Sequence, residues 1–336
     1  MMTMNRRDMI TFAGAAGLSL AGRAGVRGAE PITKTPCGDY FDVHLHLTQR
    51  WHGEEPSVLT AKSLLRWMDA HDIARAAVLP LVSPEAFWYP VTSEFVLRET
   101  EPHRDRLIPF CAIDPRTLAT HLTTTKDVVD VLSRYRDAGA RGFGEHKPML
   151  PIDDPLCMRL YEACEEVNLP LLFHLDNNAN IDQPGLPGLA KALAAFPNLP
   201  FIGHGKGWWA SISGELTQPD LQVSYPRGPV APGGAIDRLM DAHANLYGDL
   251  SSSGAHAMLR DPEFGRAFLL RRADRLLFGT DYYDPAQTDF PHFELFHQFP
   301  LPAKELAAIT YGNAHRILGL KNTADAQPLE AVQING

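Results

Sequence analysis

The sequence has few cysteines and no cysteine motif. Four cysteines occur in 336 residues, and none belongs to a Cys-x-x-Cys pair. This absence argues against thiolate metal sites and thioredoxin-like redox chemistry. Cys157 and Cys164 lie about two turns apart on one predicted helix, which is beyond the reach of a disulfide. We therefore interpret the cysteines as packing residues.

Other signatures of function are also missing. The net charge is −9, and no basic stretch is long enough to follow a phosphate backbone, so we expect no nucleic-acid partner. The sequence contains no Gly-x-Ser-x-Gly nucleophile motif and no phosphate-binding loop. The one apolar run near the N-terminus is too short to span a bilayer comfortably, so we expect no membrane anchor.

Residues 1–29 are predicted to form a twin-arginine export signal and not a part of the fold. Arg6 and Arg7 precede an apolar run of small residues at 11–20, and the Ala and Gly residues up to Ala29 offer cleavage sites. This pattern predicts a periplasmic protein that crosses the membrane already folded. The alternative is a disordered basic N-terminus.

Strand-like and helix-like segments alternate through the rest of the chain. Eight apolar runs are predicted as strands, at 40–44, 74–79, 107–113, 140–145, 170–174, 200–204, 245–250 and 275–279. Amphipathic stretches are predicted as helices between them, at 59–70, 126–138, 155–167, 189–195, 236–242 and 263–272.

This alternation is typical of one α/β architecture, the (β/α)8 TIM barrel, which we predict for residues 38–320. Several strands are continuous apolar runs, as expected of parallel strands that are covered on both faces. Residues 304–320 are predicted as a closing helix, and residues 321–336 as a loose tail.

The segment Asp42-Val43-His44-Leu45-His46 ends the first predicted strand and carries two histidines. Because side chains alternate along a strand, His44 and His46 point the same way. Three other predicted strands end in ligand-type residues, namely His174, His204 and Asp281. The carboxyl ends of barrel strands meet at one mouth, and imidazole and carboxylate groups bind zinc and similar ions. The sequence therefore predicts a metal site.

Long irregular segments follow two of the strands, where barrel enzymes build their pockets. Residues 80–91 and 205–234 each contain a cluster of aromatic side chains, which either pack beneath the loops or line a pocket for a flat or cyclic small molecule. Our candidate substrate contacts follow ligand-bearing strands, and they are Asn177, Lys206, Trp208 and Tyr282. Histidines away from strand ends, such as His292 and His315, are predicted to have packing or surface roles.

The order of these motifs resembles the amidohydrolase superfamily, and more narrowly the amidohydrolase-related group that includes aminocarboxymuconate semialdehyde decarboxylase-like proteins. The resemblance spans about residues 38–320. It rests on the histidines of the first strand, the strand ends at His174 and His204, and the segments Gly279-Thr280-Asp281 and Asn313-Ala314-His315-Arg316. A weaker match lies at 247–251.

The resemblance implies a role for each position. His44, His46 and Asp281 would hold a metal ion, with His174 as a further ligand. Asp281 would also exchange a proton with bound water or with the substrate. His204 would polarise the substrate or guide protons in members with one ion, and would bind the second ion in members with two. The implied cofactor is a divalent metal, first of all zinc, as one or two ions.

The fourth strand departs from the decarboxylase-like pattern. Glu145 and Lys147 are predicted on one face of this strand, and His146 on the other. Binuclear amidohydrolases place a bridging carboxylate here, either a glutamate or a carbamylated lysine, so Glu145 is a candidate metal ligand. Lys147 is the weaker candidate because Pro148 indicates that the strand has ended. The alternative is that Glu145 pairs with Lys147 or Arg141, and a bulge would exchange the two faces.

Three functions are compatible with these observations, all with a small-molecule partner and with either a monomer or a homo-oligomer. The leading hypothesis is a metal-dependent hydrolase that cuts an ester, lactone or amide with metal-activated water. The second is a nonoxidative decarboxylase of an aromatic or muconate-type acid, in which Asp281 and His204 move protons. The third is a barrel that binds a ligand without catalysis.

Overall fold

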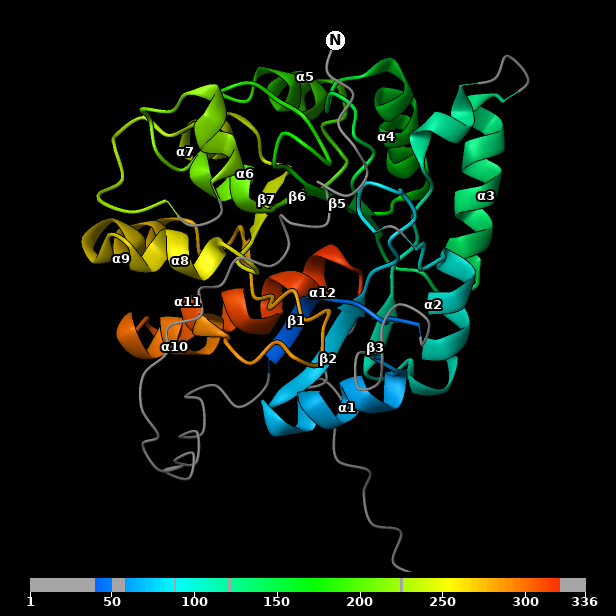
Figure 1. Cartoon of the computed structure of the whole chain (residues 1–336), viewed down its shortest axis with the longest axis horizontal. Helices are drawn as coiled ribbons and strands as arrows, with labels where there is room; N and C mark the ends of the chain where they lie inside the picture. Colours follow the sequence, from blue (N-terminus) through cyan, green and yellow to red (C-terminus); the bar gives the residue numbers. More distant parts are fainter. Residues whose placement is uncertain (1–39, 50–57, 88, 120–122, 224–225, 321–336) are drawn as a thin grey trace, which may run out of the picture. The chain divides into compact units, whose positions relative to one another are not determined.

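The computed structural model describes residues 40–49, 58–87, 89–119, 123–223 and 226–320. In this part of the chain, eight parallel strands alternate with helices (Figure 1). The strands are β1 (Tyr40–Leu45), β2 (Ile73–Val78), β3 (Leu107–Pro109), β4 (Phe143–His146), β5 (Leu171–His174), β6 (Phe201–His204), β7 (Leu246–Asp249) and β8 (Leu276–Leu277).

The strands form a closed ring. Regular ladders join β1 to β3 in one group and β4 to β8 in another. A parallel bridge between Cys111 and Phe143 connects the two groups beyond β3, and a second bridge between Leu45 and Tyr282 connects the chain after β8 to β1. Both gaps are therefore closed, and the predicted (β/α)8 barrel is confirmed.

Helices surround the strands (Figure 1). They are α1 (Ala61–Ala70), α2 (Ser93–Thr100), α3 (Thr125–Asp137), α4 (Pro155–Val167), α5 (Pro187–Ala195), α6 (Lys206–Ala210), α7 (Ala235–Ala242), α8 (Gly254–Leu259), α9 (Pro262–Arg271), α10 (Pro291–Gln298), α11 (Ala303–Ala307) and α12 (Asn313–Ile317). Several begin at side chains that accept a hydrogen bond from the first turn, which explains their starting points; these caps are Thr60, Thr92, Thr124, Asp154 and Asp261.

The order of predicted strands and helices is confirmed, whereas several bounds differ. The third strand was predicted over 107–113 but ends at Pro109, because only three of its residues pair with β2. The short helices α2, α6, α8 and α10 were not predicted. They lie in connections whose apolar spacing is too short to show a helical period.

The predicted closing helix over 304–320 is divided into α11, a π-helical turn η6 (Ala308–Gly312) and α12. In the π-helical turn, the carbonyl of Ile309 accepts a hydrogen bond of 3.0 Å from the amide of Phe278. In a continuous α-helix this carbonyl would bind an amide of the helix itself. The turn thus ties the last helix to the chain leaving β8.

Buried apolar side chains form two clusters. One lies between the strands and the helices, and the other contains Phe41, Val43, Ile108, Leu172 and Ile202 together with residues of α12. The register of β1 against β2 shifts between Asp42 and Leu45.

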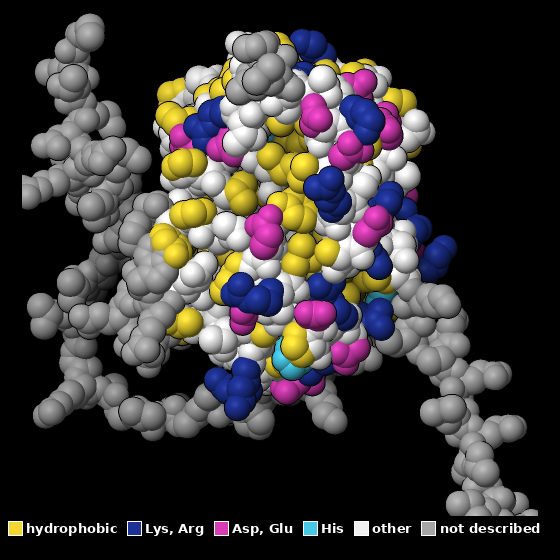
Figure 2. All heavy atoms as spheres, turned by 90° about the vertical axis from the view of Figure 1, so that its right-hand side faces the viewer, with side chains coloured by type: hydrophobic (Ala, Val, Ile, Leu, Met, Phe, Trp, Pro, Cys, Tyr) yellow, Lys and Arg dark blue, Asp and Glu magenta, His cyan; other side chains and the backbone are white. Residues whose placement is uncertain are grey.

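The described side chains on the face shown in Figure 2 carry acidic and basic groups in a mixed arrangement. No helix in the described part of the chain is long and apolar enough to cross a membrane. The predicted export signal at 1–29 and the predicted tail at 321–336 lie outside the described residues, and both stay predictions.

The fourth strand contains an irregularity that places the candidate ligand Glu145. Phe143 pairs with Leu171 and His146 with Phe173, so β4 holds one residue more than β5 over this stretch. Gly144 lies in the irregularity with φ +145°, and a Cβ atom there would lie 2.5 Å from the carbonyl oxygen of Leu172. Only glycine fits this position.

We expect Gly144→Ala to destabilise the fold by about 1–3 kcal/mol more than Gly233→Ala, because the added methyl group meets backbone that cannot move away. Gly233 is the matched control, since its φ of +84° is also positive but a Cβ atom there would meet nothing within 4 Å. Urea unfolding of the two variants measures the difference. Equal losses would contradict the close approach to Leu172.

Candidate metal centre and active site

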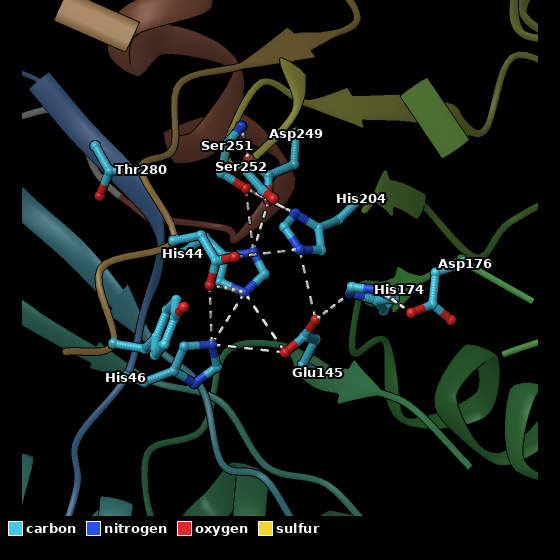
Figure 3. A network of polar contacts seen from close by, with 12 residues as sticks. His44, His46, Glu145, His174, Asp176, His204, Asp249, Ser251, Ser252 and Thr280 are labelled. Atoms are coloured by element: carbon cyan, nitrogen blue, oxygen red, sulfur yellow. Dashed lines mark hydrogen bonds and ion pairs between the residues drawn. The ribbon is translucent and has the colours of Figure 1, made fainter. Parts of the chain in front are cut away.

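The predicted ligands converge at the carboxyl ends of the strands (Figure 3). They come from β1, β4, β5, β6 and the segment after β8, and they are His44, His46, Glu145, His174, His204 and Asp281. In the described part of the chain, these side chains make up three overlapping groups whose potential ligand atoms lie within 4.8 Å of one another. Residues that are far apart in the sequence thus meet at one mouth, as the barrel topology predicts.

Five of these side chains lie close to one another, in overlapping groups of three. The Nε2 atoms of His44 and His46 are 3.1 Å apart, and Oε2 of Glu145 lies 3.7 Å and 3.5 Å from them. Oδ1 of Asp281 lies 3.7 Å from His44 Nε2 and 3.6 Å from His46 Nε2. Oδ2 of Asp281 lies 3.7 Å from the Nε2 atom of His204.

Hydrogen bonds on the far side of each imidazole fix which nitrogen faces the centre of this group. Nδ1 of His46 is 3.0 Å from the carbonyl oxygen of Leu79, which can only accept a hydrogen bond. Nδ1 of His44 is 2.7 Å from Oδ2 of Asp249. Although burial opposes ionisation, hydrogen bonds from His204 and His44 hold the pKa of Asp249 below its ordinary value. Both Nδ1 atoms therefore donate, and both Nε2 atoms face the centre.

His204 is oriented in the same way through a serine. Its Nδ1 atom is 2.7 Å from Oγ of Ser251, and the hydroxyl of Ser251 donates to Oδ2 of Asp249 at 2.7 Å. Because the serine proton is already used, Oγ accepts the proton of His204 Nδ1. The Nε2 atom of His204 therefore also presents a lone pair to the centre, as metal-ligating histidines with such outer partners do.

The centre is built for a cation. His204 Nε2 and Glu145 Oε2 are buried and have no hydrogen-bond partner in the described structure. Burying such acceptors without a donor is costly unless a positive charge lies among them. Burial opposes protonation of His44, but Asp281, Asp249 and Glu145 outweigh it and raise the pKa of His44 well above its ordinary value. A metal ion would take the lone pair that this proton occupies, and the carboxylates that favour the proton also favour a cation there. The residues therefore fit a divalent metal.

His174 has a different environment from the other histidines. Its Nδ1 atom is 2.8 Å from Oε1 of Glu145, and its Nε2 atom is 3.2 Å from Oδ2 of Asp176. Burial and the charge of Lys147 oppose protonation, but the two carboxylates raise the pKa of His174. With a carboxylate at each nitrogen, His174 has no lone pair directed at the centre. His174 also belongs to one of the three potential metal groups, with Glu145 and His204, so the ligand role that the resemblance implies stays a prediction.

Glu145 presents one oxygen to the centre. Its Oε1 atom accepts from His174 and from Nζ of Lys147, which is 2.9 Å away. The predicted ion pair with Lys147 is therefore present, whereas Arg141 bonds to backbone carbonyls instead. Burial opposes the charge on Lys147, but Glu145 and Asp281 raise the pKa of this amine, and an ammonium group cannot form a carbamate. Oε1 also lies 3.5 Å from Nε2 of His204, and Glu145, His174 and His204 form one of the three potential metal groups, so the donor set fits one ion or two.

A cavity of about 290 Å³ opens beside the centre. Its wall combines apolar, aromatic and charged side chains, and the lining residues are His46, Thr48, Leu81, Ala86, Phe87, Lys147, Asp281 and Tyr283. Asp281 is 19% exposed, whereas Glu145 is fully buried. Burial opposes ionisation of Asp281, but His44, His46 and His204 lower its pKa to about 2. Asp281 is thus an ionised carboxylate that both the centre and the cavity can reach.

Two predicted substrate contacts do not fit their positions and are corrected. Trp208 is fully buried, packs edge-on against Phe173, and lies over Gly203 in the core. Tyr282 stacks on Trp67 of α1, outside the ring of strands. Tyr283, and not Tyr282, lines the cavity beside Asp281.

The other two predicted contacts lie near the mouth but do not line the cavity. Asn177 lies in the loop after β5, where its Oδ1 atom accepts from the amide of Asp182 at 3.1 Å. Its side chain therefore shapes the loop. Lys206 is the first residue of α6 and is half-buried.

Sequence reasoning missed the residues that orient the ligands. Asp249 and Ser251 were noticed only within the weak family match at 247–251. Asp249 nevertheless ends a predicted strand, as His174 and His204 do, and that placement was a usable signal. Its backbone carbonyl accepts a hydrogen bond of 2.9 Å from Nε1 of Trp209, which connects the buried tryptophan to the site.

Asp42 is a core partner that aligns β1 with the chain after β8. It accepts from the amide of His44 at 2.9 Å and from the hydroxyl of Thr280 at 2.6 Å. Complete burial raises the pKa of Asp42 to about 7, against the opposing effect of these hydrogen bonds. Thr280 precedes Asp281, so this contact fixes the spacing between His44 and Asp281.

Comparison with known proteins identifies the family. A family model described as amidohydrolase matches residues 41–320, which is well over half of the chain. The chain therefore belongs to the amidohydrolase family, and it is an enzyme of this metal-dependent superfamily. A search of curated protein sequences gives no match.

Solved structures with the same fold include both decarboxylases and a hydrolase. A 5-carboxyvanillate decarboxylase from Sphingomonas paucimobilis has a TM-score of 0.55 and 14% identity, over 84% of this chain and 100% of that one. A probable 2-pyrone-4,6-dicarboxylic acid hydrolase from Acinetobacter baumannii has a TM-score of 0.53 and 15% identity, over 84% and 99%. A dihydroxybenzoic acid decarboxylase from Polaromonas, with bound manganese, has a TM-score of 0.52 and 15% identity, over 85% and 98%.

We expect the metal-loaded protein to hold one ion per chain, because Oε1 of Glu145 is occupied by Lys147 and His174. Glu145→Gln should weaken metal binding strongly, and the matched control Glu263→Gln, in the first turn of α9, should bind normally. Plasma mass spectrometry of the dialysed proteins measures the stoichiometry. Two ions in the wild type that fall to one in Glu145→Gln would show a bridging role instead.

Asp249→Asn should lower metal affinity by about 10- to 100-fold, the usual effect of losing an outer partner of ligating histidines. The asparagine keeps only one acceptor oxygen, so it cannot accept from His44, from the Ser251 hydroxyl and from the Ser251 amide as the two carboxylate oxygens do. The control is Asp261→Asn, which alters the cap of α9 away from the centre. Competition with a chromogenic chelator gives the affinities, and equal affinities in the two variants would contradict the orienting role.

Proposed function

We propose that this enzyme is a metal-dependent hydrolase that cuts an ester, lactone or amide bond in a small molecule carrying a carboxylate. The observation that carries the proposal is Glu145, whose Oε2 atom lies 3.7 Å and 3.5 Å from the Nε2 atoms of His44 and His46. A ligating carboxylate on the fourth strand departs from the decarboxylase-like pattern and favours metal-activated water.

The ion would supply Lewis acidity, polarising a carbonyl oxygen and lowering the pKa of bound water toward about 7. His44, His46, His204, Glu145 and Asp281 would hold it. The histidine-rich donor set suits zinc, and the manganese in the related decarboxylase structure makes manganese the second candidate.

Asp281 is the proposed proton carrier. It is ionised, it is the one metal-facing carboxylate that is open to the cavity, and its Oδ1 and Oδ2 atoms face different imidazoles. In that position it can accept the proton of the attacking water and return it to the leaving group. The backbone bond from the amide of Asp281 to the carbonyl of His44, 3.0 Å long, keeps the carboxylate in place.

Lys147 is the proposed anchor for the substrate carboxylate. It is the one cationic side chain among the residues that line the cavity, and its charge survives burial beside Glu145. Leu81, Phe87 and Tyr283 give the same wall an apolar and aromatic surface. These side chains suit a compact molecule with one acidic end. The similar structures support this choice, since their names refer to a pyrone dicarboxylic acid and to carboxylated aromatic rings.

The second candidate is a nonoxidative decarboxylase of an aromatic or muconate-type acid. It is favoured by the decarboxylases among the similar structures. In that reaction Asp281 would deliver a proton to the carbon that loses carbon dioxide. For either reaction we propose export to the periplasm through the twin-arginine segment at residues 1–29.

A panel of carboxylated lactones, esters and amides, run beside hydroxybenzoic and muconate-type acids, separates the two reactions. We expect hydrolysis of at least one lactone or ester and no release of carbon dioxide. Asp281→Asn should lower kcat by about 10²- to 10⁴-fold, the range for a lost general base. The control is Asp284→Asn, which changes a carboxylate in the same loop outside the cavity. Carbon dioxide release without hydrolysis would refute the hydrolase and favour the lyase.

A further inference from the structure

His292 is a buried polar side chain that the proposed chemistry does not use. It lies on α10, which follows β8, and only 3% of its surface is exposed. Its Nε2 atom is 3.1 Å from the carbonyl oxygen of Ser252. Sequence analysis assigned it a packing or surface role because it is not at a strand end.

The hydrogen bonds of His292 do not fit a role in packing alone. The carbonyl of Ser252 can only accept, so Nε2 carries the proton and Nδ1 presents a lone pair. Nδ1 is buried and has no hydrogen-bond partner in the described structure. Burying such an acceptor without a donor is unfavourable, and an apolar side chain of similar size would avoid this cost. What the histidine adds over an apolar residue is the donor that reaches Ser252.

Ser252 lies in a backbone conformation that needs support. Its φ is +51°, in the left-handed region that is unfavourable for a residue with a Cβ atom. It belongs to the turn between β7 and α8, directly after Ser251 (Figure 3). A hydrogen bond to its carbonyl from a neighbouring helix restrains this turn.

The same turn carries the groups that orient two proposed ligands. The amide of Ser251 donates to Oδ1 of Asp249 at 2.9 Å, and the hydroxyl of Ser251 donates to Oδ2 at 2.7 Å. Asp249 in turn accepts from His44, and Ser251 accepts from His204. A rotation of the Ser251 backbone would therefore disturb both imidazoles at once.

We propose that His292 is a positioning residue of the metal centre. By donating to the carbonyl of Ser252 it holds the turn in the shape in which Ser251 and Asp249 direct Nε2 of His204 and of His44 at the ion. The proposal rests on the proposed ligand set but not on the choice between hydrolysis and decarboxylation. Loss of the His292 bond should therefore lower metal affinity within the 10- to 100-fold range known for outer partners, roughly 10-fold here.

Two isosteric variants separate the donor from the bulk of the side chain. His292→Gln places an amide N–H near the position of Nε2, whereas His292→Met has a similar length and shape but no donor. We expect Co²⁺ to bind His292→Gln nearly as tightly as the wild type, and His292→Met about 10-fold more weakly, with a changed visible spectrum. His315→Leu is the control, because His315 is also a buried histidine with an unpartnered Nδ1 atom but lies on α12.

Titration of the full-length protein with Co²⁺, followed by visible absorption, gives the dissociation constant and the ligand field together. Thermal unfolding without metal shows whether each variant is folded. Equal Co²⁺ binding by His292→Met and His292→Gln would overturn the positioning role. Equal weakening in both and in His315→Leu would show a general packing effect and would overturn it too. A wild type without Co²⁺ binding would instead refute the proposed ligand set itself.

Discussion

The hydrogen bonds of Asp249 are the interaction on which the rest of the site depends. One carboxylate accepts from His44 directly and binds the serine that accepts from His204, so a single side chain sets the direction of two imidazoles from different strands. Trp209 and the turn after β7 hold this carboxylate in turn. The core packing of aromatic residues and the direction of the lone pairs are therefore parts of one arrangement.

Electrostatics divide the site into two halves. On one side of Glu145, Lys147 and His174 already neutralise an oxygen, while Asp176 stabilises the charge on His174. On the other side, the second oxygen of Glu145 and both oxygens of Asp281 face imidazole nitrogens. The first half is complete within the chain, and the second would be completed by a cation. This asymmetry fits the proposed roles, in which Glu145 is a fixed ligand and Asp281 transfers a proton.

The local sequence pattern was sufficient to predict the barrel and the side chains at its mouth, because the period and the ends of strands can be recognised from neighbouring residues. It could not give the direction of each imidazole, since the bond between His44 and Asp249 joins residues 205 positions apart. Trp208 was wrongly placed at the pocket, because a loop rich in aromatic residues has the same sequence pattern whether its side chains pack beneath the loop or line a pocket. The direction of Tyr282 could not be predicted either, because Asp281 lies beyond β8 with a φ of +58°, where strand alternation no longer holds.

The bond between the π-helical turn and the chain after β8 has a consequence for synthesis of the protein. Ile309 reaches Phe278, and the segment leaving β8 pairs with β1, so the first and last parts of the barrel complete each other. During synthesis, the edge of β1 that pairs with this segment stays without its partner until the chain has been made as far as Tyr282. Such an edge can pair with other chains. The barrel can therefore close only after nearly all of its strands have been translated.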